Sequence, residues 1–118
     1  RNVNDKLISV GENSKINISN INANDSFVGI ASKDGSFVMA NNIYMKNVKL
    51  PFAAYNKKLE YGKSEIFLKD IELVDFYQEW LTDNNSKIFY NKNPVGKISK
   101  KINSIIYNKD LSLINRTN

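Results

Sequence analysis

The sequence predicts an all-β fold, a β-solenoid of about four stacked coils of roughly 22 residues each. Three observations lead to this prediction. A serine preceded by a turn-forming pair recurs at regular places in the chain, at Ser14, Ser36, Ser64 and Ser86. Apolar residues alternate with other residues after each serine, as in a strand with one buried face. A polar residue, mostly Asn or Asp, then marks a corner in each repeat.

The apolar residues of each repeat fall into columns. Two and four residues after the serine, the residues expected to face inward are Ile16 and Ile18, Val38 and Ala40, Ile66 and Leu68, and Ile88 and Tyr90. The corner six residues after the serine holds Asn20, Asn42, Asp70 and Lys92, and a second inward column follows at Ala23, Met45, Leu73 and Val95. A third inward column precedes the serines and contains Ile8, Ile30, Phe52 and Trp80. Each coil therefore reads as short strands separated by sharp bends.

The middle interval, from Ser36 to Ser64, is longer than the intervals on either side of it, which equal one another. Phe52 follows Ile30 by the same number of residues that separates Ser14 from Ser36. The separation from Phe52 to Ser64, however, is twice the separation from Ile30 to Ser36. The register is therefore intact on both sides of an insertion. About six extra residues lie between Ala53 and Ser64, and we expect them to form a loop that projects from one corner.

A repeat of this length leaves few architectures open. Helical repeats run to about 33 residues or more, and the leucine-rich pattern is absent. In a solenoid, equivalent side chains stack about 4.8 Å apart and build a core that no single coil could bury. We assign residues 1–118 to one domain, with coils over 5–90 and a cap or tail over 91–118. Within that tail, the spacing of Ile98, Ile102, Ile105 and Ile106 fits either a helix or a distorted strand.

Two segments, Val28–Val38 and Ile66–Ile71, resemble coils of right-handed parallel β-helix proteins of the pectin-lyase-like superfamily. The resemblance covers about residues 5–90, and it implies a right-handed parallel β-helix. The segment Phe52–Gly62 is similar to β-helix regions of bacterial exported or surface proteins, some of which accompany a CotH-type kinase-like domain. Enzymes of the superfamily use an arginine base with acidic calcium ligands, or an aspartate cluster. Arg1 and Arg116 are the only arginines here, so no catalytic residue carries over.

The composition narrows the possible functions. The chain has neither cysteine nor histidine, which excludes disulfides, thiol nucleophiles and histidine-based catalysis or metal binding. We predict no cofactor and no metal site. The net charge of +5 favours acidic partners weakly, and no apolar run is long enough to span a membrane. Because the chain starts at Arg1 without a methionine, we expect it to be the C-terminal fragment of a longer, exported or surface protein.

Three groups of residues are candidate sites. The insertion loop, residues 53–63, combines Tyr55, Lys57, Lys58, Glu60 and Tyr61, which could stack on sugars and attract anions, or could simply pack back on the coil. Carboxylates recur at Glu65, Asp70, Glu72, Asp75 and Glu79, although a solvated face explains them equally well. A basic tail holds Lys97, Lys100, Lys101, Lys109 and Arg116 without any nucleic-acid motif.

Three functions remain open at this point. The favoured one is a non-catalytic scaffold or adhesion-type module of a larger exported bacterial protein, with a polysaccharide or another protein domain as partner. The second is a carbohydrate-binding module that uses the 53–63 loop. The third is part of a polysaccharide lyase or hydrolase whose remaining catalytic groups lie elsewhere. The residues leave the oligomeric state undetermined.

Overall fold

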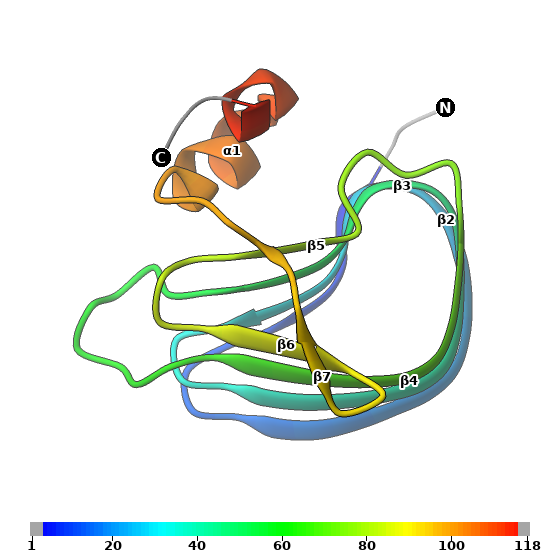
Figure 1. The fold of residues 1–118 in the computed structure, drawn as a ribbon, viewed down its shortest axis with the longest axis horizontal. Coiled ribbons are helices and arrows are strands. Elements are labelled where there is room, and N and C mark those ends of the chain that lie inside the picture. The colour runs from blue at the N-terminus through cyan, green and yellow to red at the C-terminus, as the bar shows by residue number, and fades with distance from the viewer. Residues whose placement is uncertain (1–3, 116–118) are drawn as a thin grey trace.

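The computed structural model describes residues 4–115, so Arg1 and Arg116 lie outside the described part. The fold is all-β, with one mostly parallel sheet and little helix (Figure 1). Its elements, in chain order, are β1 (Asn4–Val10), β2 (Lys15–Lys33), β3 (Phe37–Tyr55), β4 (Glu65–Val74), β5 (Trp80–Thr82), β6 (Lys87–Tyr90), β7 (Asn93–Val95), β8 (Lys97–Ile98), the helix α1 (Ile102–Asn108) and the 3₁₀ helix η1 (Leu111–Asn115).

Neighbouring strands pair in parallel at the intervals that the serines predict. Pairing of β1 with β2, and of β2 with β3, is offset by the interval between Ser14 and Ser36, as in Ile8↔Ile30 and Ile30↔Phe52. That offset still holds at Lys33↔Tyr55. From Phe37↔Glu65 onward the offset between β3 and β4 is the longer interval between Ser36 and Ser64, and Phe52↔Trp80 keeps it. The insertion therefore lies between Tyr55 and Glu65, as predicted, and the third inward column is confirmed.

The four serines form a single file, as the repeat predicts. The backbone N–H of Ser14 donates to Oγ of Ser36 (3.3 Å), and that of Ser64 donates to Oγ of Ser86 (3.2 Å). Between them, the N–H of Gly35 donates to Oγ of Ser64 at 3.1 Å. The hydroxyls of Ser36, Ser64 and Ser86 thus each accept a hydrogen bond from a backbone N–H of the preceding turn in the file. All three serines are buried.

Two ladders of Asn and Asp turn the corners. Asn20, Asn42 and Asp70 have φ of 60°, 59° and 57°, the left-handed region that Asn and Asp adopt more readily than most residues. The amide of Asn42 donates to Oδ1 of Asn20 at 2.7 Å. A second ladder, which the sequence reasoning missed, stands five residues further on at Asp25, Asn47 and Asp75, with φ of 58°, 58° and 59°. These two bends let a long strand such as β2 or β3 change direction while its pairing continues.

The residues of the inward columns form the first of two hydrophobic cores. This core is open at the end formed by the start of β2. Val38, Ile66 and Ile88 are fully buried, whereas Ile16, predicted to face inward with them, is 41% exposed. The reason is that β1 pairs only with residues 26–32 of β2, so among the described residues no strand covers Lys15–Asn24. Ile16 thus keeps its place in the inward column, paired with Val38, but it is exposed because no described strand covers it.

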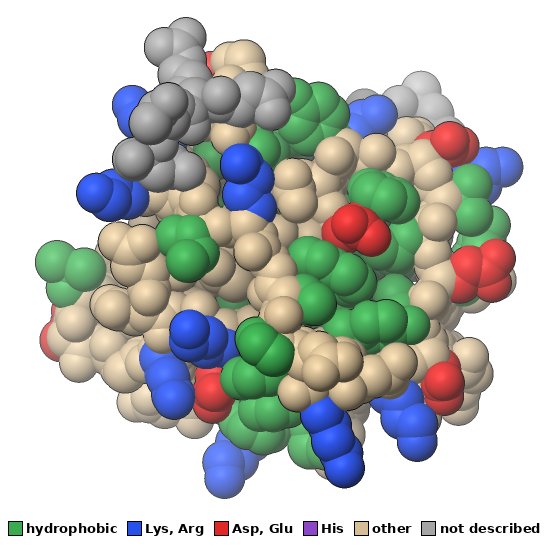
Figure 2. Space-filling view, viewed as in Figure 1, with side chains coloured by type: hydrophobic (Ala, Val, Ile, Leu, Met, Phe, Trp, Pro, Cys, Tyr) green, Lys and Arg blue, Asp and Glu red, His purple; other side chains and the backbone are tan. Residues whose placement is uncertain are grey.

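The opposite end of the stack is also partly uncovered, because β6 pairs only with residues 65–68 of β4. Hydrophobic side chains gather near the centre of the view of that end (Figure 2). A shallow hollow of about 300 Å³ lies beside β8, and another of about 230 Å³ is lined by Ile71, Leu73, Phe76, Glu79, Trp80 and Tyr90. Trp80 is half-buried between Phe52 and Tyr90, with ring centroids 6.4 and 5.5 Å away, so it belongs to the core as expected.

The fourth repeat departs from the predicted coil after Tyr90. Asn91 and Lys92 both have positive φ, 49° and 71°, and they form a tight hairpin that sends β7 back antiparallel to β6. Lys92 is thus a hairpin residue and not a further corner of the ladder. Val95 still packs against the first core, but from the antiparallel strand.

The C-terminal segment covers both an edge and a face of the sheet. The short strand β8 pairs with β5, while α1 lies against the outer face of the coils (Figure 1). Ile102, Ile105 and Ile106 are buried there in a second core with Val28, Ala31, Leu50, Ala53, Tyr55 and Leu81. The isoleucine spacing thus forms a helix from Ile102, whereas Ile98 belongs to β8. None of the described helices is long and apolar enough to cross a membrane.

Candidate functional site

Of the predicted insertion loop, residues 53–63, the part that lies outside the strands is 56–63, because β3 continues to Tyr55. These residues project from one corner of the sheet and are drawn in green at the left of Figure 1. Its base is fixed by side chains that bind its backbone. Oδ1 of Asp34 accepts hydrogen bonds from the N–H groups of Lys57 (2.7 Å) and Lys58 (2.9 Å). The amide of Asn56 donates to the carbonyls of Tyr61 (3.1 Å) and Gly62 (2.7 Å). The loop therefore has a defined conformation.

The five predicted site residues divide into two groups. Tyr55 is only 1% exposed and packs in the second core, so its ring is not available for stacking on a ligand. Lys57, Lys58 and Glu60 are exposed, and Tyr61 is half-buried. The structure thus brings Lys57, Lys58, Glu60 and Tyr61 together on the loop and separates Tyr55 from them.

An ion pair ties this loop to the first turn of the chain. Nζ of Lys58 lies 2.6 Å from Oε2 of Glu12, and this contact raises the pKa of Lys58. The hydrogen bond and charge of Lys58, with a further hydrogen bond from Tyr61, lower the pKa of Glu12. The pKa of Tyr61 is raised by desolvation and by the charge of Glu12. Lys58 and Tyr61 are therefore already engaged with Glu12.

A cleft of about 420 Å³ lies beside the loop and is lined by Gly11, Glu12, Lys33, Asp34, Lys57 and Lys58. The pKa of Lys33 is lowered by its burial and then by the positive charges of Lys6 and Lys57. The carboxylates of Asp34 and Glu12 raise this pKa, so the cleft carries charges of both signs, with three lysines and two carboxylates in its lining.

The other two predicted clusters do not form a site in the described structure. Asp70 and Asp75 are corner residues of the two ladders, so Asp70 and Glu72 do not form a regular strand pair. No group of three or more acidic side chains within residues 4–115 could hold a metal ion. Lys97, Lys100, Lys101 and Lys109 are exposed around β8 and α1.

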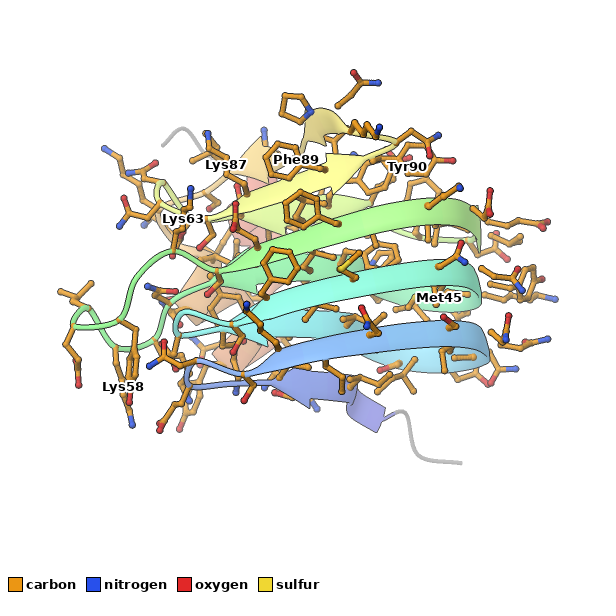
Figure 3. The ribbon with its side chains drawn as sticks, turned by 90° about the horizontal axis from the view of Figure 1, so that it is seen from below. Met45, Lys58, Lys63, Lys87, Phe89 and Tyr90 are labelled. Carbon is orange, nitrogen blue, oxygen red and sulfur yellow. The ribbon has the colours of Figure 1, made fainter. Side chains whose placement is uncertain are left out.

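A surface that the sequence reasoning missed lies on the outward face of β2, β3, β4 and β6. Phe37, Met39, Phe67 and Phe89 form an aromatic stripe across neighbouring strands, and Figure 3 labels Phe89 on that face. The ring centroid of Phe67 lies 4.9 Å from the centroid of Phe37 and 4.7 Å from that of Phe89. Met39 is 50% exposed. A groove of about 690 Å³ runs over this face, lined by Asn17, Ile18, Ser19, Met39, Ala40, Asn41, Phe67, Leu68, Lys69, Phe89, Asn91 and Lys92.

The signal for this stripe was present in the sequence. The residues between the inward positions, Asn17, Met39, Phe67 and Phe89, occupy one column of the repeat. They make the strand alternation less clean in the later repeats, and an apolar residue at an outward position is the mark of an exposed apolar surface.

Comparison with protein-family models, with curated proteins and with solved structures finds no match for this chain. The resemblance to pectin-lyase-like coils therefore stays a prediction.

Proposed function

We propose that this chain is a non-catalytic module, built as a right-handed parallel β-helix, that holds a rigid recognition surface within a larger exported bacterial protein. The observation that carries the proposal is the register of the sheet, in which parallel strands repeat at the intervals of the serine file and bring equivalent residues into line. Repeat architectures of this kind present extended surfaces, and their role is commonly recognition. The similarity of the segment Phe52–Gly62 to β-helix regions of bacterial exported or surface proteins supports the extracellular setting.

The side-chain chemistry supports a non-catalytic role. A chain without histidine lacks the commonest general base, and a chain without cysteine lacks a thiol nucleophile. Within the described residues, Asp70 and Asp75 of the predicted cluster sit at corners and Glu72 is exposed, whereas Glu65 and Glu79 are half-buried. The alternative that the chain is part of a polysaccharide lyase or hydrolase stays a prediction.

The direct test is turnover. Purified protein is incubated with panels of neutral and acidic polysaccharides, and both reducing ends and unsaturated products are measured. We expect no product above that of a heat-denatured sample. Release of either product, removed by unfolding the protein, would refute the non-catalytic assignment.

A second candidate is a carbohydrate-binding module at the insertion loop, and the cleft beside the loop favours it. Lys33 and Lys57 line this cleft, which could admit a carboxylate. Tyr61 lies on the same loop as Lys57. The ligand would be an acidic sugar, because the unbalanced charges near Lys33 are positive.

This candidate is tested on an array of acidic and neutral glycans with the variants Lys57→Ala and Tyr61→Ala. Lys49→Ala is the matched control, since Lys49 is an exposed lysine on β3 away from the loop. Binding of uronate-containing glycans that both loop variants abolish, and that the control retains, would support the module. Binding unaffected by the loop variants would remove the loop from consideration.

A further inference from the structure

The aromatic stripe presents ring edges to the outside. Since β4 lies between β3 and β6, Phe67 gives one face to Phe37 and the other to Phe89, at interplanar angles of 30° and 13°. The remaining face of Phe37 is approached by Nζ of Lys15, 6.0 Å from its centroid. Rings stacked in this direction turn their edges away from the sheet. Stacking on a sugar needs an open ring face, and both faces of Phe67 are already covered by its neighbours.

The electrostatics of this face favour an acidic ligand. The edge of an aromatic ring carries partial positive charge, which attracts carboxylate and carbonyl oxygens. Five lysines lie on or around the stripe, Lys15, Lys63, Lys69, Lys87 and Lys92. Within the described chain, the outward columns before the first corner, over residues 15–19, 37–41, 65–69 and 87–89, contain a single carboxylate, Glu65, and it is already 3.7 Å from Nζ of Lys63. Asp70 and Glu72 lie at and beyond that corner of β4. The face therefore combines an apolar strip with a surplus of positive charge.

We propose that this face is a docking site for an acidic, amphipathic polypeptide segment. The apolar strip would bury aliphatic or aromatic side chains of the partner, which an acidic polysaccharide lacks. The surrounding lysines would pair with Asp and Glu residues that lie between those apolar side chains in the same segment. The groove crosses four neighbouring strands, about 14 Å at the spacing of a sheet. That length accommodates about four extended residues or about two and a half turns of helix.

The test selects peptides from a random library displayed on phage against the full chain. Selected peptides are synthesised, and their affinities are measured by fluorescence anisotropy. We expect sequences that combine Asp and Glu with Leu, Ile or Phe, and affinities that fall as ionic strength rises. A selection that yields no binder, or binders without acidic residues, would overturn the proposal.

Variants locate the binding. The charge reversals Lys69→Glu and Lys87→Glu together should weaken the selected peptides about tenfold or more, and Met39→Thr about fivefold. Lys46→Glu is the control, because Lys46 is exposed on β3 outside this face, and it should change affinity less than about twofold. Thermal melts confirm that each variant is folded. Met39 is half exposed, so its replacement carries the test if other variants fail to fold.

Two further outcomes decide against the proposal. Weakening by the Lys46→Glu control that equals, per reversed charge, the weakening by the Lys69→Glu and Lys87→Glu pair would show that net charge alone drives binding. Binding of oligogalacturonate that Met39→Thr abolishes, with no peptide bound, would assign the face to a polysaccharide.

Discussion

Replacing Ser64 by alanine removes a hydroxyl that joins two turns and the insertion loop. Its Oγ is fully buried, accepts the N–H of Gly35 at 3.1 Å, and donates toward Oδ1 of Asn56 (2.7 Å) and the carbonyl of Tyr55 (3.1 Å). A lost hydrogen bond costs about 1 kcal/mol, and leaving the part-buried N–H of Gly35 without its partner adds about 1–2 kcal/mol, the lower part of the range for a buried donor. We therefore expect Ser64→Ala to lower the free energy of unfolding by about 2–3 kcal/mol, a large share of the roughly 5–15 kcal/mol typical of a domain.

Urea denaturation followed by circular dichroism measures this loss, provided that the m-value is unchanged. Ser14→Ala is the matched control. Ser14 heads the same file but is half-buried at the open end, and its hydroxyl donates only to the carbonyl of Gly11 at 2.8 Å. We expect the control to lose less than about 1 kcal/mol. Equal losses for the two variants, or a loss below about 0.5 kcal/mol for Ser64→Ala, would refute the role assigned to the buried hydroxyl.

Three other perturbations test separate parts of the structure. Asp34→Ala should free the base of the insertion loop, lower stability by about 1–3 kcal/mol and speed tryptic cleavage of the loop; unchanged cleavage would contradict the anchoring. Gly29→Ala would place a Cβ 2.6 Å from Sδ of Met45 and against the backbone of the next strand, so we expect a loss of about 1–3 kcal/mol by urea denaturation, and a neutral effect would refute the close packing. Because its folded pKa is lowered, Glu12 stabilises the fold above its ordinary pKa of 4.5 and loses this contribution as the pH falls through the lowered value. An NMR titration should show the Glu12 pKa rise in Lys58→Ala, and an unchanged pKa would show that the ion pair is not formed in solution.

Sequence reasoning recovered the features that depend on one residue type at one repeat position. The serine file, the Asn and Asp corners and the inward columns recur because each repeat of the parallel sheet places the same residue type in the same environment. The insertion could be located for the same reason, since the columns continue on both sides of it.

Features that depend on what lies above or below a residue could not be predicted. Ile16 has the pattern of a buried residue, and it is exposed because β1 pairs with β2 only at residues 26–32 and so does not cover residue 16. Tyr55 reads as a loop aromatic, but it is buried because α1 packs over that face. Met39, Phe67 and Phe89 share one column of the repeat, but the contact of Phe67 with Phe37, which lies in the neighbouring column, needed the structure.

The central claim, parallel coils in register with one insertion, can be tested by disulfide trapping, because the chain has no cysteine. Ser19 pairs with Asn41 and Asn41 with Lys69, and all three are exposed. Cysteine pairs at 19 and 41, and at 41 and 69, should therefore oxidise to intramolecular disulfides, as detected by mass spectrometry of tryptic peptides. A pair at 41 and 63, where a repeat without the insertion would place the partner, should remain reduced. Cross-linking of 41 with 63 but not with 69 would contradict the register.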